Sequence, residues 1–116
     1  MIMSIADETM LELQDSTITM LHELRIGIHR LGYKCLTIAV PCFVEDDTQS
    51  LSKELYPYVA ECLGHTEWYA VERAIRMVIL DAWNKRDPAV WERYFPEQKK
   101  VPTNKQFLAV LAEKMR

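Results

Sequence analysis

Residues 50–85 read SLSKELYPYVAECLGHTEWYAVERAIRMVILDAWNK, and this stretch decides the fold of the chain. Ser50 precedes apolar residues that recur at helical spacing, and Gly64 interrupts the pattern. A second helical pattern runs from about Glu67 to Lys85. Because serine caps helix starts and glycine favours helix ends, the spacing predicts two helices joined by a short turn.

The second of these helices, at about 100° per residue, has an apolar side and an outward side. The apolar side carries Val71, Ile75, Val78 and Ala82, and the outward side carries Tyr69, Arg73, Arg76 and Leu80, with Glu72 and Met77 at its flanks. Two helices, a glycine-containing turn and outward arginines are typical of a helix-turn-helix, whose second helix lies in the DNA major groove. The alternative is an amphipathic helix with solvated arginines, helped by a Glu72–Arg76 pair worth about 0.3 kcal/mol. The pattern alone leaves both open.

The formal charge of −3 hides an asymmetry along the chain. Residues 1–67 hold 4 Lys and Arg against 11 Asp and Glu, whereas residues 68–116 hold 10 against 6. Phosphate neutralisation is a local event, so DNA affinity depends on where the positive charge lies and not on the total. The basic half begins at the second helix, which favours a nucleic-acid partner.

The bulk composition is that of an ordinary soluble globular protein. A length of 116 residues, of which 49% are hydrophobic and 27% charged, fits one domain with its own core. No apolar run approaches the length that spans a bilayer, and the acidic N-terminus does not resemble a signal peptide. We therefore expect a cytoplasmic protein.

Three cysteines, Cys35, Cys42 and Cys62, are too far apart for a metal-binding or redox CxxC pair. Each lies among apolar residues, so we expect buried, reduced thiols. The three histidines lack metal-ligand spacing, and the chain has no glycine-rich phosphate loop and no spaced acid–base set. The sequence therefore predicts no metal, no cofactor and no enzymatic activity.

The N-terminal segment, residues 1–14, has weak periodicity and is expected to form a frayed tail or linker remnant. One helix-turn-helix domain is expected to follow at residues 15–116. Asp15 or Ser16 is the expected cap of its first helix, and Gly32 is the expected end of that helix.

Prolines interrupt two of the middle helices. Residues 33–44 (YKCLTIAVPCFV) predict a buried second helix, which Pro41 should end or kink near Val40. The acidic residues that follow predict a solvated loop. Pro57 lies inside the third helix, so we expect a bend or a split into two short helices. Thr66 is the expected N-cap of the fourth helix.

Two further helices complete the predicted fold. Asp87 and Pro88 open a short fifth helix, because aspartate caps helices and proline suits the first helical position. Its aromatic residues are expected to pack on the bundle: Trp91, Tyr94 and Phe95. Residues 102–104 introduce the last helix, with an apolar stripe of Phe107, Leu108, Leu111 and Met115. The sequence thus predicts an all-α fold of about six helices in a compact bundle that contains the helix-turn-helix.

From Ser16 to the C-terminus the sequence resembles the DNA-binding effector domain of the stage-zero sporulation response regulator (sporulation protein A) family. The resemblance rests on LYPYVA at 55–60, VERAIR at 71–76 with Ala82-Trp83 after it, PTN at 102–104 with Phe107, and the early His22-Glu23. VERAIR is the most specific element, because it matches the family's recognition helix. The resemblance implies an all-helical domain that binds double-stranded DNA in tandem copies, or as a homodimer, on a short promoter box.

By the same resemblance, Glu72, Arg73 and Arg76 match the positions that meet base edges. Arginine offers two donors to guanine O6 and N7, and glutamate can accept from cytosine N4. Backbone contacts are expected from Thr66, Asn104 and Lys105. If the domain binds DNA, we expect Tyr69 to touch the backbone or a thymine methyl. We also expect phosphates to be neutralised by Lys85, Arg86, Lys99, Lys100 and Lys105.

The chain departs from the family pattern in four respects. Ala70 stands where the family carries an arginine, and Met77 where it carries a histidine, so we expect weaker or altered base readout. Residues 1–15 cannot form the family's N-terminal receiver domain, so the chain is either a fragment or a stand-alone homologue. The region associated with RNA polymerase, Asp87 to Phe95 here, matches poorly, which leaves activation and repression open.

Two hypotheses of different classes follow. The first is a sequence-specific DNA-binding domain of a sporulation-type transcription regulator, which reads the major groove with the helix at residues 67–85. The alternative is a degenerate stand-alone effector without specific DNA binding, acting as a protein-interaction module for the full regulator or for RNA polymerase. The acidic first half, Ala70 and Met77 favour the alternative.

Overall fold

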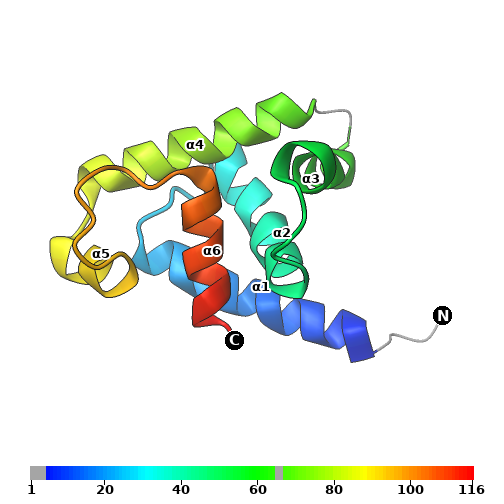
Figure 1. Ribbon diagram of the computed structural model, residues 1–116, viewed down its shortest axis with the longest axis horizontal. Helices are drawn as coiled ribbons and strands as arrows, with labels where there is room; N and C mark the ends of the chain where they lie inside the picture. Colours follow the sequence, from blue (N-terminus) through cyan, green and yellow to red (C-terminus); the bar gives the residue numbers. More distant parts are fainter. Residues whose placement is uncertain (1–4, 65–66) are drawn as a thin grey trace.

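The computed structural model describes residues 5–64 and 67–116, which form six α-helices, one π-helical turn and no strand. The elements are α1 (Ile5–Glu23), α2 (Leu31–Glu45), the π-helical turn η1 (Leu51–Leu55), α3 (Tyr56–Cys62), α4 (Trp68–Lys85), α5 (Pro88–Tyr94) and α6 (Asn104–Lys114). α2 lies at the centre, in contact with α1, α3, α4 and α6 (Figure 1). Among the described helices, none combines the length and the apolar character needed to cross a membrane. The predicted all-α fold is confirmed.

A single hydrophobic core joins the helices. The predicted apolar faces all contribute to it: Val71, Ile75, Val78 and Ala82 of α4, Trp91 and Tyr94 of α5, Phe95, and Phe107, Leu108 and Leu111 of α6 are buried, and Met115 is half-buried. The predicted start of α5 is also confirmed, because the Asp87 carboxylate accepts the N–H of Ala89 (3.0 Å) and Pro88 is the first helical residue.

The first helix begins earlier than predicted. α1 starts at Ile5 and not at a cap on Asp15 or Ser16, so the expected frayed tail is wrong from Ile5 onward, while residues 1–4 lie outside the described residues. Ahead of the expected cap, the Gln14 amide already donates to the carbonyl of Thr37 in α2 (3.4 Å). Tertiary contacts of this kind stabilise a helix whose own periodicity is weak. The domain boundary expected at residue 15 stays a prediction.

The first helix also ends earlier than predicted, at Glu23 and not near Gly32. The N–H groups of Arg25 and Ile26 donate back to carbonyls of α1 (3.1 and 2.9 Å), and Arg25 has φ 62°. Such a pair of bonds ends a helix with one left-handed residue, which is usually glycine. Here an arginine takes the position, and its guanidinium donates to the carbonyl of Lys85 at the end of α4 (3.0 Å).

Gly32 lies inside α2 and is a packing residue. A Cβ atom at this position would lie 2.3 Å from the carbonyl oxygen of Ala74 and 2.5 Å from Cγ2 of Val78, both in α4. The missing side chain therefore lets the backbones of α2 and α4 approach closely. The sequence pattern marked this glycine as a helix end, because glycine is common both at helix ends and where backbones approach closely, and the sequence alone does not distinguish the two.

We expected Pro41 to end or kink α2 near Val40. The end is wrong, because α2 continues past Pro41 to Glu45, and the kink stays a prediction. A proline removes the N–H that would donate to the carbonyl four residues earlier, which is that of Thr37. This carbonyl accepts the side-chain amide of Gln14 instead. A residue of α1 thus replaces the hydrogen bond that proline deletes, and the helix continues.

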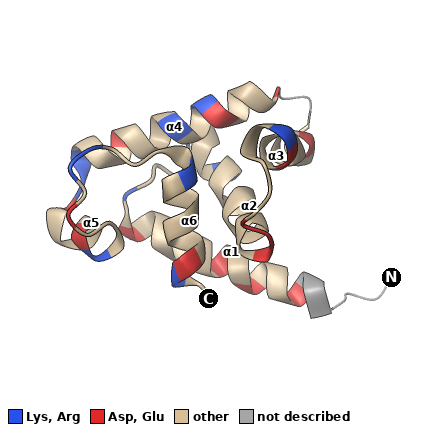
Figure 2. Ribbon diagram, viewed as in Figure 1, with Lys and Arg blue, Asp and Glu red and all other residues tan. Residues whose placement is uncertain are grey.

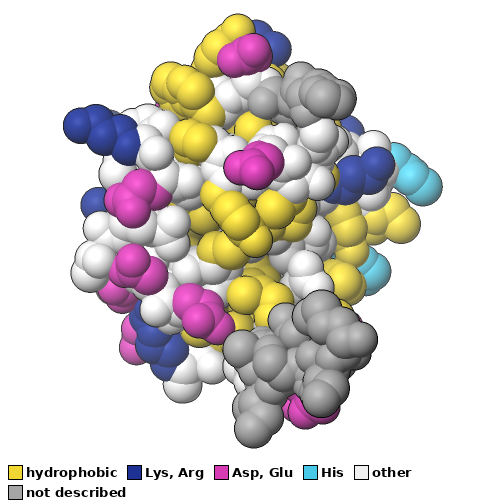
Figure 3. Space-filling model, turned by 90° about the vertical axis from the view of Figure 1, so that its right-hand side faces the viewer, with side chains coloured by type: hydrophobic (Ala, Val, Ile, Leu, Met, Phe, Trp, Pro, Cys, Tyr) yellow, Lys and Arg dark blue, Asp and Glu magenta, His cyan; other side chains and the backbone are white. Residues whose placement is uncertain are grey.

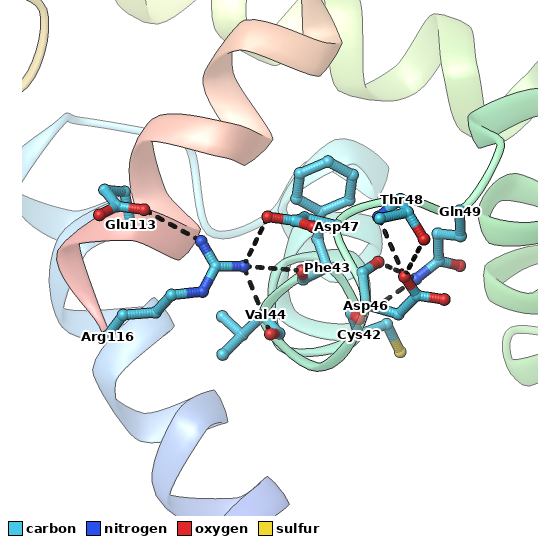
Figure 4. Close-up of polar contacts among 9 residues, drawn as sticks. All are labelled: Cys42, Phe43, Val44, Asp46, Asp47, Thr48, Gln49, Glu113 and Arg116. Atoms are coloured by element: carbon cyan, nitrogen blue, oxygen red, sulfur yellow. Dashed lines mark hydrogen bonds and ion pairs between the residues drawn. The ribbon is translucent and has the colours of Figure 1, made fainter.

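The C-terminal end of α2 meets the end of the chain. The predicted loop of acidic residues is exposed. Arg116 Nη2 donates to the carbonyls of Phe43 and Val44 (3.5 and 3.4 Å) and lies 3.1 Å from a carboxylate oxygen of Asp47 (Figure 4). A guanidinium here satisfies carbonyls that have no partner within the helix and interacts favourably with the negative helix end.

The segment that leads to α4 follows the prediction closely. The Ser50 hydroxyl accepts a backbone N–H of the first turn (3.2 Å), and the helix that contains Pro57 is split into η1 and α3. Gly64, with φ 72°, follows the end of α3 as expected. Thr66, the expected cap of α4, lies outside the described residues, and Glu67 occupies the N-cap position.

The three cysteines are free thiols in different environments. Cys35 is buried, Cys42 is half-buried and Cys62 is exposed. The expected burial is confirmed for Cys35 and wrong for Cys62, because the buried stripe of α3 passes from Val59 to Leu63 and leaves Cys62 beside it. Burial raises the pKa of the Cys35 thiol to about 11.

Candidate nucleic-acid interface

α4 presents the arginine-bearing face that the sequence predicts. Arg73 and Arg76 are exposed, and within the described part of the chain Arg73 makes no hydrogen bond or ion pair. Arg76 Nη1 lies 3.5 Å from Glu72 Oε1, and these side chains are 57% and 40% exposed. An exposed pair one turn apart contributes about 0.3–0.5 kcal/mol, so it does not prevent Arg76 from engaging a stronger acceptor.

The first turn of α4 is fixed by Trp68, a residue that the sequence did not single out. Its ring stacks on Tyr56 of α3, with ring centroids 6.5 Å apart and planes 1° from parallel. The ring of Tyr69 meets Trp68 edge-on at 5.9 Å, and Tyr69 remains 53% exposed. The start of α4 is thereby tied to α3. The adjacent aromatic pair is the signal in the sequence that could have indicated this contact.

Asn104, expected at the DNA backbone, lies at the junction of three helices. Its Nδ2 donates to the backbone carbonyl of Glu72 in α4 (3.0 Å) and to the hydroxyl of Tyr56 in α3 (3.2 Å). Burial raises the pKa of Tyr56, which keeps the hydroxyl protonated. The amide therefore positions α4 against α3 and the start of α6. A phosphate contact by the same residue stays a prediction.

Of the cations expected at phosphates around this face, some contact neighbouring residues and others are exposed to solvent. Figure 2 shows Lys and Arg on α4, in the segment between α5 and α6 and at the start of α6. Lys85 Nζ lies 2.9 Å from Asp81, whose pKa this hydrogen bond holds below its usual value. Arg86 lies 3.7 Å over the ring of Trp83 and donates to its carbonyl (2.7 Å). The remaining lysines are exposed: Lys99, Lys100 and Lys105.

A groove of about 470 Å³ runs between α4 and the segment that enters α6. Its lining joins Met77 and Leu80 of α4 to residues 101–105, with Arg76 and Lys105 among the lining residues. Three apolar side chains in it are partly open to solvent: Met77 at 45%, Leu80 at 39% and Val101 at 36%. The sequence placed Met77 and Leu80 at or near the outward side, but only the fold brings Val101 beside them.

The face on the side of α3 differs in character. Figure 3 shows hydrophobic side chains at its centre with Asp and Glu around them, and no gathering of Lys and Arg. In the described residues, no three His, Cys, Asp or Glu side chains form a group that could hold a metal ion. The α4 side, where exposed arginines and lysines meet, is therefore the surface that best suits a polyanion.

A short helix, a turn and a long helix with outward arginines are consistent with the helix-turn-helix class of DNA-binding domains. The family model described as sporulation initiation factor Spo0A C terminal matches residues 17–115. The chain therefore belongs to this family of DNA-binding effector domains of sporulation transcription regulators, which is not a family of enzymes. The resemblance noted from the sequence motifs is confirmed.

Proposed function

We propose that this domain binds double-stranded DNA sequence-specifically, with α4 in the major groove. The observation that carries the proposal is the exposure of Arg73 and Arg76 on a helix whose opposite side is fixed in the core by Val71, Ile75 and Val78. α4 has 18 residues. At 1.5 Å per residue it is about 27 Å long, which is enough to cross a major groove about 12 Å wide.

Each residue of the face has a role that suits its chemistry. Arg73 and Arg76 donate in pairs to guanine O6 and N7, and Glu72 accepts from cytosine N4 while its carboxylate orients Arg76. Tyr69 touches the backbone or a thymine methyl. Phosphate neutralisation falls to the cations at the edges of the face, namely Lys85, Arg86, Lys99, Lys100 and Lys105, with Thr66 and Asn104 as further backbone contacts.

The domain binds its box in tandem copies or as a homodimer, and α5 is the surface offered to RNA polymerase. In α5, Trp91 and Tyr94 are buried, whereas Ala89, Glu92 and Arg93 are exposed and available for such a contact. A regulator of this kind acts on the chromosome and hence in the cytoplasm.

The test is selection of preferred sites from a random duplex library, followed by binding measurements over a range of salt concentrations. Arg73→Ala and Arg76→Ala should each cost about 1–3 kcal/mol and relax the preference at one base position. Lys105→Ala should weaken binding to all sequences equally and reduce the salt slope by about 1. Arg93→Ala is the matched control, because Arg93 is an exposed arginine on α5, 4.0 Å from Glu23.

Equal binding of the wild type and Arg73→Ala to every duplex would refute base reading by α4. Binding that does not weaken as salt rises would refute phosphate contact as well, because release of counterions makes DNA affinity strongly salt-dependent. Either result would favour the alternative of a protein-interaction module.

A further inference from the structure

We infer that Met77 recognises the 5-methyl group of a thymine next to the base pair that Arg76 contacts. This contact rests on the DNA binding proposed above and adds a base preference that the arginines do not supply. Met77 follows Arg76 directly and lies one helical turn after Arg73, so the three side chains occupy neighbouring positions on α4.

Met77 forms a ridge between two hollows of the surface. On one side it lines the groove of about 470 Å³ together with Leu80 and Val101. On the other side it lines a hollow of about 210 Å³ together with Leu31, at the start of α2. The side chain is 45% exposed between these depressions, so its carbon and sulfur atoms project toward whatever covers α4.

The chemistry of the major groove restricts what an exposed methionine can contact there. Among the groups on base edges in this groove, the thymine C5 methyl is the apolar one, and the others are hydrogen-bond donors and acceptors. A cytosine amino group or a guanine oxygen against Met77 would lose water without gaining a partner. A flexible thioether adapts its shape to a methyl group. Leu80 and Val101 extend the apolar surface around this contact.

The charges around the ridge favour DNA over an apolar protein segment. The two hollows beside Met77 are lined by four cationic residues and one anionic residue: Arg30 and Arg73 on one side, and Arg76, Lys105 and Glu72, the partner of Arg76, on the other. An apolar protein partner would remove these cations from water without supplying anions, which is costly. A duplex supplies a methyl group at the base edge and phosphates on both sides of it.

The experiment uses the preferred box from the selection and replaces each thymine in turn by deoxyuridine, which lacks only the 5-methyl group. Wild-type affinity should fall about three- to fourfold at one or two thymines adjacent to the base pair that depends on Arg76, and be unchanged elsewhere. Met77→Ala should show no loss at these positions. Met10→Ala, a methionine change on α1, is the matched control and should keep the wild-type pattern.

A gain-of-methyl arm completes the test. Where cytosine is placed at the sensitive position, 5-methylcytosine should restore part of the affinity for the wild type but not for Met77→Ala. If the wild type prefers a defined box yet binds every deoxyuridine duplex equally, or if Met77→Ala keeps the deoxyuridine loss, the methyl contact is refuted while sequence-specific binding stands. If no box is preferred, the proposed function itself fails, and the contact with it.

Discussion

Replacing Gly32 by alanine should destabilise the fold by about 2 kcal/mol and shift α4, because this position sets the closest approach between α2 and α4. The new Cβ atom would lie 2.3 Å from the carbonyl oxygen of Ala74, where ordinary contacts begin at 3.4 Å. The nearest atoms of Val78 would lie at 2.5 and 2.7 Å. One helix must therefore move by about 1 Å, the difference between these distances and ordinary contact.

The magnitude follows from two opposing terms. Overpacking a well-packed site costs about 1–3 kcal/mol, and the upper end applies because the clash involves backbone of α4 that cannot rotate away. Alanine returns up to about 1 kcal/mol, because glycine is the poorer helix former. The difference is a destabilisation of about 2 kcal/mol, and for a domain of this size the midpoint of thermal unfolding should fall by about 8 °C.

The assay is thermal and urea unfolding followed by far-UV circular dichroism, with DNA affinity measured on the same samples. Gly27→Ala is the matched control, since its nearest foreign atom is Cγ of Arg30 at 3.1 Å, in a flexible exposed side chain. It should remain within about 1 kcal/mol of the wild type. If Gly32→Ala proves as stable as Gly27→Ala, the close approach of α2 and α4 is wrong.

Three further predictions follow from individual contacts. Asn104→Ala removes the hydrogen bonds to α4 and α3, so it should lower the free energy of unfolding by about 1–2 kcal/mol in unfolding curves. In titrations it should weaken DNA binding at every box equally. A change at one base position alone would contradict this positioning role. Arg116→Ala removes the bonds to the end of α2 and should lower the free energy of unfolding by about 1 kcal/mol, and an unchanged urea midpoint would refute the contact. Burial raises the pKa of the Cys35 thiol to about 11, so little Cys35 thiolate exists at pH 8. Mass spectrometry should therefore find the exposed Cys62 alkylated first and Cys35 modified only on unfolding. Equal rates of alkylation at the two cysteines would disprove this.

The sequence predicted those elements in which local signals agree with the packing. The two faces of α4 follow from periodicity, and caps such as Ser50 and Asp87 are local in origin. The errors arose where a distant residue completes the structure. Arg25 ends α1 in a conformation usual for glycine, and Gln14 compensates for the proline in α2. Neither compensation is visible in a window of neighbouring residues.

In the candidate site, too, local patterns predicted some residues, and others depend on contacts between distant segments. Arg73 and Arg76 lie on one helix, so helical geometry alone could place them on its outward side. Val101 reaches the groove from another segment, and Asn104 bonds to a carbonyl of α4. Contacts between segments so far apart in sequence depend on the tertiary fold, and the charge pattern carries no information about them. The family resemblance led us to expect a DNA-backbone contact from Asn104, which stays a prediction, but nothing in the sequence indicated its role in positioning α4.

Four contacts anchor α4, and they explain why some mutations should change stability while others should change base preference. Gly32 allows α2 to pack closely, Trp68 stacks on α3, Asn104 bonds from α6, and Arg25 donates to the carbonyl at the C-terminal end of α4. Contacts to four different parts of the chain fix the axis of the helix before DNA arrives, so little ordering is left to oppose binding. Removing an anchor should therefore reduce stability and weaken binding to every sequence alike. Removing the exposed Arg73, which has no partner within the described residues, should leave stability unchanged and alter the preference at one base position only.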